Sequence, residues 1–134
     1  MSLLGAFDIG SSGLVAQAMR LNVTASNVAN AESVAGPDGR TYRSRQVLFS
    51  PAAIEKAQGV GVQVSAIVES AEPLRMEYKP FHPMANASGY VEIPNVNPVE
   101  EMVNMISASR SYQANVEMMN TTRQLMLKTL DLGR

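Results

Sequence analysis

The chain has 134 residues, no cysteine and a formal net charge of −1 from 11 basic and 12 acidic side chains. This length suits one domain, and the balanced charge argues against a nucleic-acid-binding surface. Without cysteine the chain has no disulfide framework, no thiolate metal site and no cysteine nucleophile.

Neither a membrane span nor a secretory signal is expected. Nowhere do 18 consecutive apolar residues occur, which is the shortest run that suggests a transmembrane helix. Residues 1–20 have no basic segment before their apolar residues, and Asp8 interrupts the stretch. We therefore expect no integral membrane protein and no cleaved signal peptide.

Residues 3–30 are predicted to form a helix, because one stripe recurs at alternating spacings of three and four. Its members are Leu4, Phe7, Ser11, Leu14, Ala18, Leu21, Ala25 and Val28. Glycine costs roughly 1 kcal/mol relative to alanine inside a helix, so the run from Gly10 to Gly13 is expected to bend or fray it. Only Asp8 and Arg20 are charged in the first thirty residues. Such a neutral polar face predicts a helix enclosed by protein on several sides.

The middle of the chain, residues 31–97, is rich in turn signals. Gly36-Pro37-Asp38-Gly39 predicts a turn. Alternating apolar residues predict strands at 60–69 and 74–78, with weaker patterns at 42–49 and 90–93. The expected result is a small antiparallel β unit.

The last part of the chain is predicted to be a second helix over residues 98–132. Asn97, Pro98 and Glu100 supply a capping side chain, a proline for the first turn and an acid near the start, and Gly133 follows the end. Its stripe contains Met102, Met105, Ser109, Tyr112, Val116, Met119, Arg123, Met126 and Leu130. Such a helix would span about 50 Å at ~1.5 Å per residue.

These elements predict an α+β fold in which two long terminal helices pack as a coiled-coil-like pair, with the antiparallel β unit inserted between them. The expected divisions are residues 1–30, 31–97 and 98–134. Fixing the backbone of each helical residue costs about 1–2 kcal/mol. The apolar burial within a single helix pair leaves little margin over the sum of these costs. The terminal segments are therefore expected to be frayed in the monomer and to order on assembly.

Residues with catalytic potential are few. His82 lies in a proline-flanked apolar loop, and an enzyme site around His82 and Glu72 stays open as an alternative. Glu100 and Glu101 fit the dipole of a starting helix, and Arg43 and Arg45 fit a solvated face or salt bridges. A second alternative is a peripheral membrane protein, but the N-terminal helix lacks the basic residues that attract anionic lipid.

Particular residues now add to the pattern. Residues 25–31, Ala-Ser-Asn-Val-Ala-Asn-Ala, resemble the N-terminal signature of flagellar rod and hook proteins. Residues 94–115, from Pro-Asn-Val-Asn-Pro to Tyr-Gln-Ala-Asn, are similar to the C-terminal signature of the same family, and residues 130–134 are also typical. The passage at 36–43 and Gln113, in place of an acid common among relatives, favour the proximal-rod branch.

The resemblance implies a structural subunit of the flagellar proximal rod, with no enzymatic activity, no cofactor and no metal. It implies export through the flagellar type III apparatus and polymerisation in the periplasm. Expected partners are copies of the chain and the rod proteins FlgB, FlgF, FlgG and FliE. The terminal helices would form the inner core of a tube that transmits torque and encloses the export channel.

On this interpretation the stripe residues form the assembly interface, within or between subunits. The expected interface residues of the first helix are Leu4, Phe7, Leu14, Ala18, Leu21, Ala25, Asn27, Val28 and Asn30. Those of the second helix are Met102, Met105, Ile106, Ser109, Tyr112, Asn115, Val116, Met119, Met126 and Leu130. Asn27, Asn30, Asn115 and Asn120 are expected to satisfy backbone or partner groups. The first helix is expected to be the more enclosed of the two.

Overall fold

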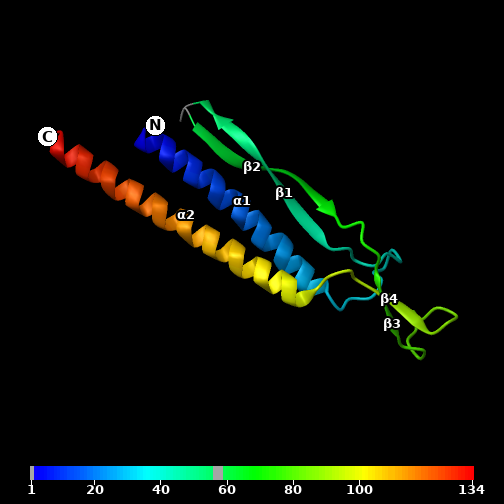
Figure 1. Ribbon diagram of the computed structural model, residues 1–134. Coiled ribbons are helices and arrows are strands. Elements are labelled where there is room, and N and C mark those ends of the chain that lie inside the picture. Colours follow the sequence, from blue (N-terminus) through cyan, green and yellow to red (C-terminus); the bar gives the residue numbers. More distant parts are fainter. Residues whose placement is uncertain (1, 56–58) are drawn as a thin grey trace.

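Two long antiparallel helices frame the chain in a computed structural model that describes residues 2–55 and 59–134 (Figure 1). The elements in chain order are α1 (Leu3–Asn30), β1 (Arg45–Ile54), β2 (Gly59–Glu69), β3 (Arg75–Tyr78), β4 (Tyr90–Ile93) and α2 (Pro98–Leu132). The predicted α+β fold, with helices at both ends and antiparallel strands between them, is confirmed. None of the described helices is long and apolar enough to cross a membrane.

The helix α1 is continuous, which corrects the expected bend between Gly10 and Gly13. Ser2 caps its start, because the Ser2 hydroxyl accepts a hydrogen bond from the Gly5 amide at 3.0 Å. The low helix propensity of glycine predicted a weak point in α1 at Gly10 and Gly13. Packing against α2 outweighs this low propensity, since both glycines lie where α2 comes close.

The start and end of α2 are as the sequence predicts. The Asn97 side chain accepts hydrogen bonds from the amides of Val99 and Glu100, at 3.1 and 3.4 Å. Pro98 occupies the first turn, where its missing amide hydrogen costs nothing. At the other end the Gly133 amide donates to the carbonyls of Thr129 and Leu130.

The strands β1 and β2 form a two-stranded antiparallel ribbon that pairs Arg45 with Glu69 and Ile54 with Gly59. The first strand begins at Arg45 and continues to Ile54, so the expected strand at 42–49 was placed too early and ended too soon. Pro51 tolerates this position because the described sheet has only two strands and each has an unpaired edge. The ribbon runs along α1 on the side away from α2 (Figure 1).

The remaining strands, β3 and β4, form a separate two-stranded sheet beyond the end of the helix pair (Figure 1). Tyr78 and Tyr90 face each other across it with ring centroids 5.3 Å apart. The expected single β unit is therefore two sheets among the described residues, one along the helices and one beyond them.

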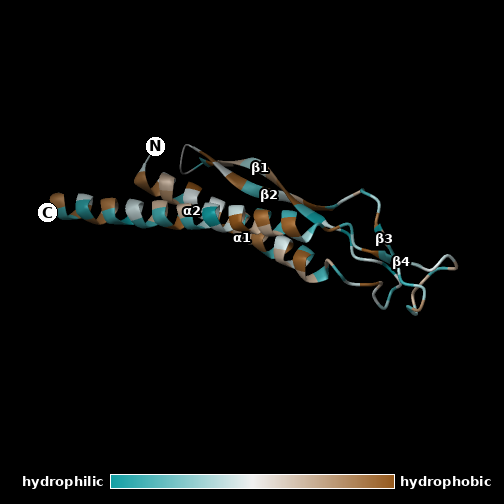
Figure 2. Ribbon diagram, turned by 60° about the horizontal axis from the view of Figure 1, so that its bottom comes forward, coloured by the Kyte–Doolittle hydropathy of each residue, from teal (hydrophilic) through white to brown (hydrophobic). Residues whose placement is uncertain are grey.

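The best-buried apolar side chains gather where these parts meet. Val91 and Val96 are each 1% exposed, and Ile93 is also buried. All three precede α2 in the chain. Along the helix pair the buried apolar residues are small, namely Ala16 and Ala108. Figure 2 shows apolar residues (brown) along both helices, and several of the large ones are exposed, among them Leu4, Met102, Ile106 and Leu130. The larger apolar side chains therefore stay available for contacts outside the chain.

Candidate assembly interface

The two helices make their closest contacts through residues with little or no side chain. A Cβ atom added to Gly10 would lie 2.5 Å from the Met118 Cε atom, and one added to Gly13 would lie 2.8 Å from the Asn115 Nδ2 atom. Real Cβ atoms do not approach that closely, so a larger residue at either position would require the Met118 or Asn115 side chain to shift. The two glycines thus permit the close approach of α1 and α2.

The same part of α1 also holds the β1–β2 ribbon. The Ser12 hydroxyl accepts a hydrogen bond from the Val62 amide at 3.1 Å and donates one to the Ile9 carbonyl at 2.7 Å. A Cβ atom on Gly61 would lie 2.6 Å from the Ser12 oxygen. Residues 10–13 are therefore the place where α1 contacts both of its neighbours most closely, which explains the run of small residues.

Near the other end of α1, Asn27 joins three parts of the chain. Its Nδ2 atom donates to the Glu101 Oε2 atom at 3.0 Å and to the Arg45 carbonyl at 2.8 Å. Its Oδ1 atom accepts from the Tyr42 hydroxyl at 2.7 Å and from the Arg45 amide at 3.0 Å. The Asn27 side chain is 1% exposed and uses all four of its hydrogen-bonding positions. One amide thus fixes α1, β1 and α2 to one another.

A second set of hydrogen bonds attaches the β3–β4 sheet to the helix pair. The Arg75 Nε atom donates to the Pro94 carbonyl at 2.9 Å, and its Nη2 atom donates to the Ala31 carbonyl at 3.1 Å. Asn95 accepts from the Ser44 amide and donates to the Glu72 carbonyl. Backbone carbonyls at the end of α1 and before α2 are thereby satisfied.

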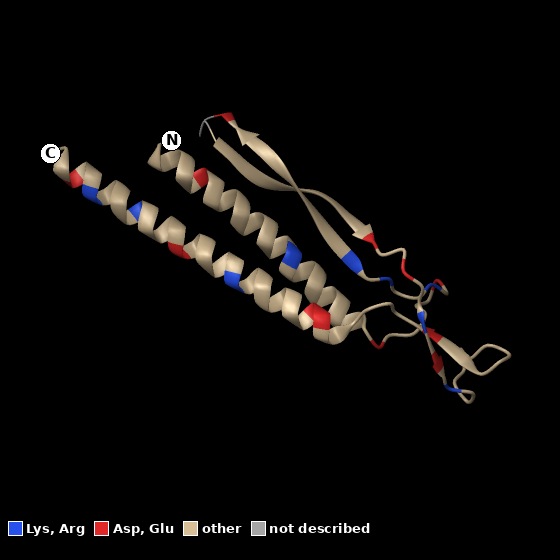
Figure 3. Cartoon of the chain, viewed as in Figure 1, with Lys and Arg blue, Asp and Glu red and all other residues tan. Residues whose placement is uncertain are grey.

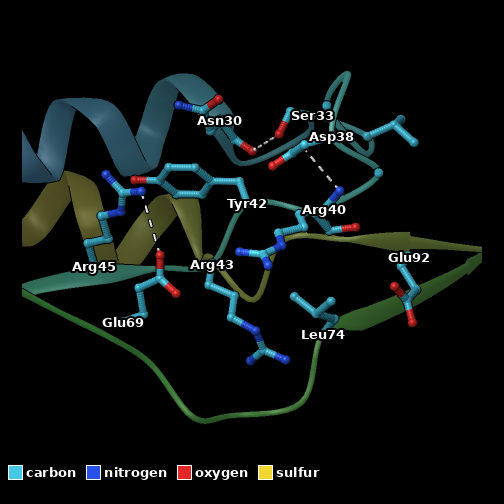
Figure 4. A pocket seen from close by; sticks show the side chains of 14 residues that line it. Asn30, Ser33, Asp38, Arg40, Tyr42, Arg43, Arg45, Glu69, Leu74 and Glu92 are labelled. Atoms are coloured by element: carbon cyan, nitrogen blue, oxygen red, sulfur yellow. Dashed lines mark hydrogen bonds and ion pairs between the residues drawn. The ribbon is translucent and has the colours of Figure 1, made fainter.

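An open hollow of about 800 Å³ lies beside the end of α1 (Figure 4). Its lining carries both signs of charge, from Asp38, Arg40, Arg43, Arg45, Glu69 and Glu92. Arg45 pairs with Glu69 at 3.5 Å and lies over the Tyr42 ring, 5.5 Å from its centroid. Arg43 instead donates to the carbonyls of Ser70 and Glu72. These contacts link the start of β1 and the segment before it to the end of β2 and the segment after it.

The residues of the proposed enzyme alternative have structural contacts. The His82 Nδ1 atom accepts a hydrogen bond from the Met84 amide at 3.1 Å, within a turn before β4. Glu72 uses its backbone carbonyl as an acceptor for Arg43 and Asn95. Both residues therefore take part in local loop geometry.

The contact line between the helices is displaced from the predicted stripes by about one residue. The most buried positions of α2 are Glu101, Ala108 and Thr122, each one residue before the predicted Met102, Ser109 and Arg123. On α1 the line follows Gly10, Gly13, Thr24 and Asn27. Close helix approach selects small and hydrogen-bonded residues, so apolarity alone marks the flank of the contact rather than its centre.

Several predicted interface residues lie at this flank and are half-buried. These are Phe7, Leu14, Ala18, Leu21, Val28 and Asn30 on α1, and Met105, Ser109, Asn115, Val116, Met119 and Met126 on α2. The others are exposed, namely Leu4, Ala25, Met102, Ile106, Tyr112 and Leu130. Asn27 alone of the predicted set is fully buried.

Of the four asparagines expected to satisfy backbone or partner groups, Asn27 and Asn30 do so within the chain. The Asn30 Nδ2 atom donates to the Ser26 carbonyl at 2.9 Å, one turn back along α1. Asn115 faces Gly13, and Asn120 is exposed. The expectation that α1 is the more enclosed helix is confirmed, because most of α2 is exposed and most of α1 is not.

Five further residues make these contacts although the sequence patterns did not predict them, namely Gly10, Ser12, Gly13, Tyr42 and Glu101. A signal existed for the first three, since four small residues in succession inside an amphipathic helix indicate a close approach. Glu101 was assigned to the helix dipole, which its neighbour Glu100 fits. Nothing in the sequence marks that Glu101 meets Asn27, 74 positions earlier.

Comparison with known proteins gives matches at both ends of the chain. A family described as flagella basal body rod protein matches residues 7–37, and one described as flagellar basal body rod FlgEFG protein C-terminal matches residues 87–132. The matched segments contain most of α1 and all of α2, together with Asn27 and Glu101. The matched segments therefore include the helix pair and the Asn27–Glu101 hydrogen bond that joins its two helices.

Full-length relatives narrow the family further. The flagellar basal-body rod protein FlgC of Yersinia enterocolitica is 58% identical, and that of Salmonella typhimurium strain LT2 is 54% identical, each over the whole of both chains. FlgC of Borreliella burgdorferi is 37% identical over 97% of each chain. The fold and both matched ends define a structural subunit of the flagellar basal-body rod class. The chain belongs, within that class, to the FlgC family.

Proposed function

We propose that this chain is a subunit of the proximal part of the flagellar rod and polymerises through α1 and α2 into a tube. The tube transmits torque and encloses the export channel. One observation carries the proposal. The helix pair has a tight inner contact of small residues and leaves large apolar side chains on its outside, including Leu4, Met102, Ile106 and Leu130.

The exposed side of α1 supports burial against further subunits. Among its eight exposed residues only Asp8 is charged, and the others are Leu3, Leu4, Val15, Met19, Asn22, Ala25 and Ala29. Figure 3 shows α1 almost free of charge beside the more strongly charged α2. Small uncharged residues are desolvated at low cost and let a neighbouring helix approach closely. The assembled subunit would therefore bury α1 on three sides, with α2 and the β1–β2 ribbon as two of them.

The proposed neighbours are copies of the chain and the rod proteins FlgB, FlgF, FlgG and FliE. The family matched at residues 87–132 is described by FlgE, FlgF and FlgG, which supports a shared C-terminal helix among such partners. We propose export through the flagellar type III apparatus without a cleaved signal, and a final position in the periplasmic rod. Its role is structural, with no catalytic step.

The test compares two substitutions of the same chemistry on exposed alanines. Ala25→Asp places a charge on the exposed side of α1, and Ala71→Asp places one in the loop between β2 and β3. In the source bacterium with the native gene replaced, Ala25→Asp is expected to abolish motility and to be missing from isolated basal bodies. The Ala71→Asp strain is expected to swim normally, and its isolated basal bodies are expected to contain the variant chain. Normal swimming with Ala25→Asp would contradict the proposal.

A further inference from the structure

A cleft of about 430 Å³ lies where α1, the start of α2 and the start of β1 meet. Its volume falls within the range of about 300–1,000 Å³ that is usual for ligand clefts in proteins. Three residues of α1 line it, Arg20, Val23 and Thr24, which share one side of the helix because they are three and four positions apart. The other lining residues are Arg45, Gln46, Val47 and Phe49 of β1 and Glu100, Glu101 and Asn104 of α2. Three elements of the chain thus converge on one cleft.

Thr24 supplies a polar group to this cleft that the chain itself does not use. Its side chain is 4% exposed. Threonines within helices often donate to the carbonyl four residues earlier, as Thr122 and Thr129 do in α2, each at 2.8 Å. The Thr24 hydroxyl makes no such bond and has no hydrogen-bond partner among the residues that the structure describes. Once a partner covers the cleft, this hydroxyl needs a hydrogen bond from that partner.

Arg20 supplies a positive charge that is also unused. It is half-buried, and its guanidinium forms no ion pair with any described residue. The other charged groups of the cleft are already engaged, since Arg45 pairs with a glutamate of β2 and Glu101 accepts a hydrogen bond from Asn27. Glu100 is exposed in the first turn of α2, where the helix dipole stabilises an acid. Arg20 is therefore the charge in the cleft that still needs a partner.

We infer that this cleft binds an acidic side chain of a neighbouring rod subunit, and that Arg20 is its ion-pair partner. A guanidinium and a carboxylate can form two parallel hydrogen bonds. The Thr24 hydroxyl and the side-chain amides of Gln46 and Asn104, which also have no hydrogen bond to the part of the chain described here, add donors around the carboxylate. The apolar side chains of the cleft contact the aliphatic carbons of the incoming residue.

Assembly makes this ion pair necessary. Only Asp8 and Arg20 are charged in α1, and Asp8 is exposed whereas Arg20 lies in the cleft. Neighbouring subunits surround the helix pair in the proposed rod, and a covered charge without an opposite charge is strongly unfavourable. A partner carboxylate removes that penalty and selects one register of the contact. The inference rests on the proposed role as a rod subunit and adds the chemistry of one contact.

The first test separates assembly from folding. Arg20→Gln removes the charge, so purified full-length monomer should unfold at the same urea concentration as the parent chain. In the source bacterium with the native gene replaced, basal bodies should contain less of this variant by roughly tenfold or more, because the partner carboxylate loses its ion pair. Arg40→Gln is the matched control, since Arg40 is exposed in the turn after α1 and lies outside the cleft.

Two results of this test would overturn the inference. One is normal incorporation of Arg20→Gln, or a loss no greater than that of Arg40→Gln. The other is a purified Arg20→Gln monomer that is clearly less stable than the parent, which would assign Arg20 a role within the chain. Deletion of the gene tests the rod role separately. If the deletion strain does not swim and Arg20→Gln restores swimming fully, the ion pair is excluded and the rod role stands.

The second test identifies the carboxylate. Arg20→Lys keeps the charge and supplies an amine, which a water-soluble carbodiimide couples to a carboxylate in contact with it through an amide bond. Basal bodies from this strain should give, by peptide mass spectrometry, an amide between position 20 and an Asp or Glu of another subunit. The inference fails if position 20 couples only to Glu100 or Glu101, couples only to a carboxylate that is not protein, or does not couple. It also fails if Arg20→Lys does not enter basal bodies.

Discussion

Asn27 and Glu101 hydrogen-bond across the helix pair, with 3.0 Å between the Asn27 Nδ2 and Glu101 Oε2 atoms. Both side chains are buried, at 1 and 8% exposure. Because the same amide also binds the Arg45 backbone and the Tyr42 hydroxyl, it fixes the last turn of α1 and the first turn of α2 against the start of β1. This end of the molecule is therefore expected to be its most rigid part.

Replacing Asn27→Ala should lower the free energy of unfolding by about 2–4 kcal/mol, because it leaves buried donors and acceptors without partners. Urea titration followed by circular dichroism measures the effect. Asn30→Ala is the control, since Asn30 donates to the Ser26 carbonyl in its own helix and lies partly exposed. The Asn30 change should cost less than about 1 kcal/mol, and equal losses at both positions would refute the joining role of Asn27.

At Gly13, substitution by alanine should destabilise the chain although alanine favours helix by roughly 1 kcal/mol. The added Cβ atom would lie 2.8 Å from the Asn115 Nδ2 atom and 3.1 Å from its Cγ atom, so the Asn115 amide would have to shift. Asn115→Ala removes the obstacle, so the double variant should be more stable than Gly13→Ala alone. A thermal denaturation cycle over the four proteins measures this coupling, and strictly additive effects would show that the close approach is unimportant.

The elements of this fold are readable from the sequence because their signals are local. Asn97 and Gly133 mark the limits of α2 within a few residues of themselves, and the stripes mark both helices. The contact line was displaced by one residue, because it depends on how closely two helices approach. Gly10 and Gly13 permit this short distance, but in the sequence their low helix propensity marks them only as weak points of the helix. The partners of Asn27 lie 15 to 74 positions away, and no local pattern contains them.

Hydrogen exchange of the monomer should be graded along α2. Amides of the α2 overhang, residues 126–132, should exchange fastest, because no part of α1 lies beside them and the leucines are exposed. Amides near Ala108 should exchange slowest, since that residue is fully buried.

The early part of α1, before Gly10, is also expected to fray and to order on assembly. Uniform strong protection of the amides of residues 3–30 in a verified monomer would contradict the prediction that α1 orders only on assembly.

Loss of the Arg75 side chain should loosen the β3–β4 sheet and leave the helix pair folded. Arg75→Ala removes the hydrogen bonds to the carbonyls of Pro94 and Ala31. Limited proteolysis should then cut residues 79–89 several times faster, with little change in helical circular dichroism. Lys79→Ala is the control, because the Lys79 side chain forms an exposed ion pair with Glu77 at 3.1 Å, and such pairs contribute about 0–1 kcal/mol. Equal cleavage of both variants would rule out this attachment.

As a rod subunit, this chain is proposed to place its helix pair in the inner core of the tube. Electron cryomicroscopy of basal bodies isolated from the source bacterium tests this placement. The chain should lie in the rod next to the membrane-embedded base, with α1 and α2 inside and the β3–β4 sheet farther out. Density for this chain outside the rod, or in a rod where α1 faces solvent along its whole length, would contradict it.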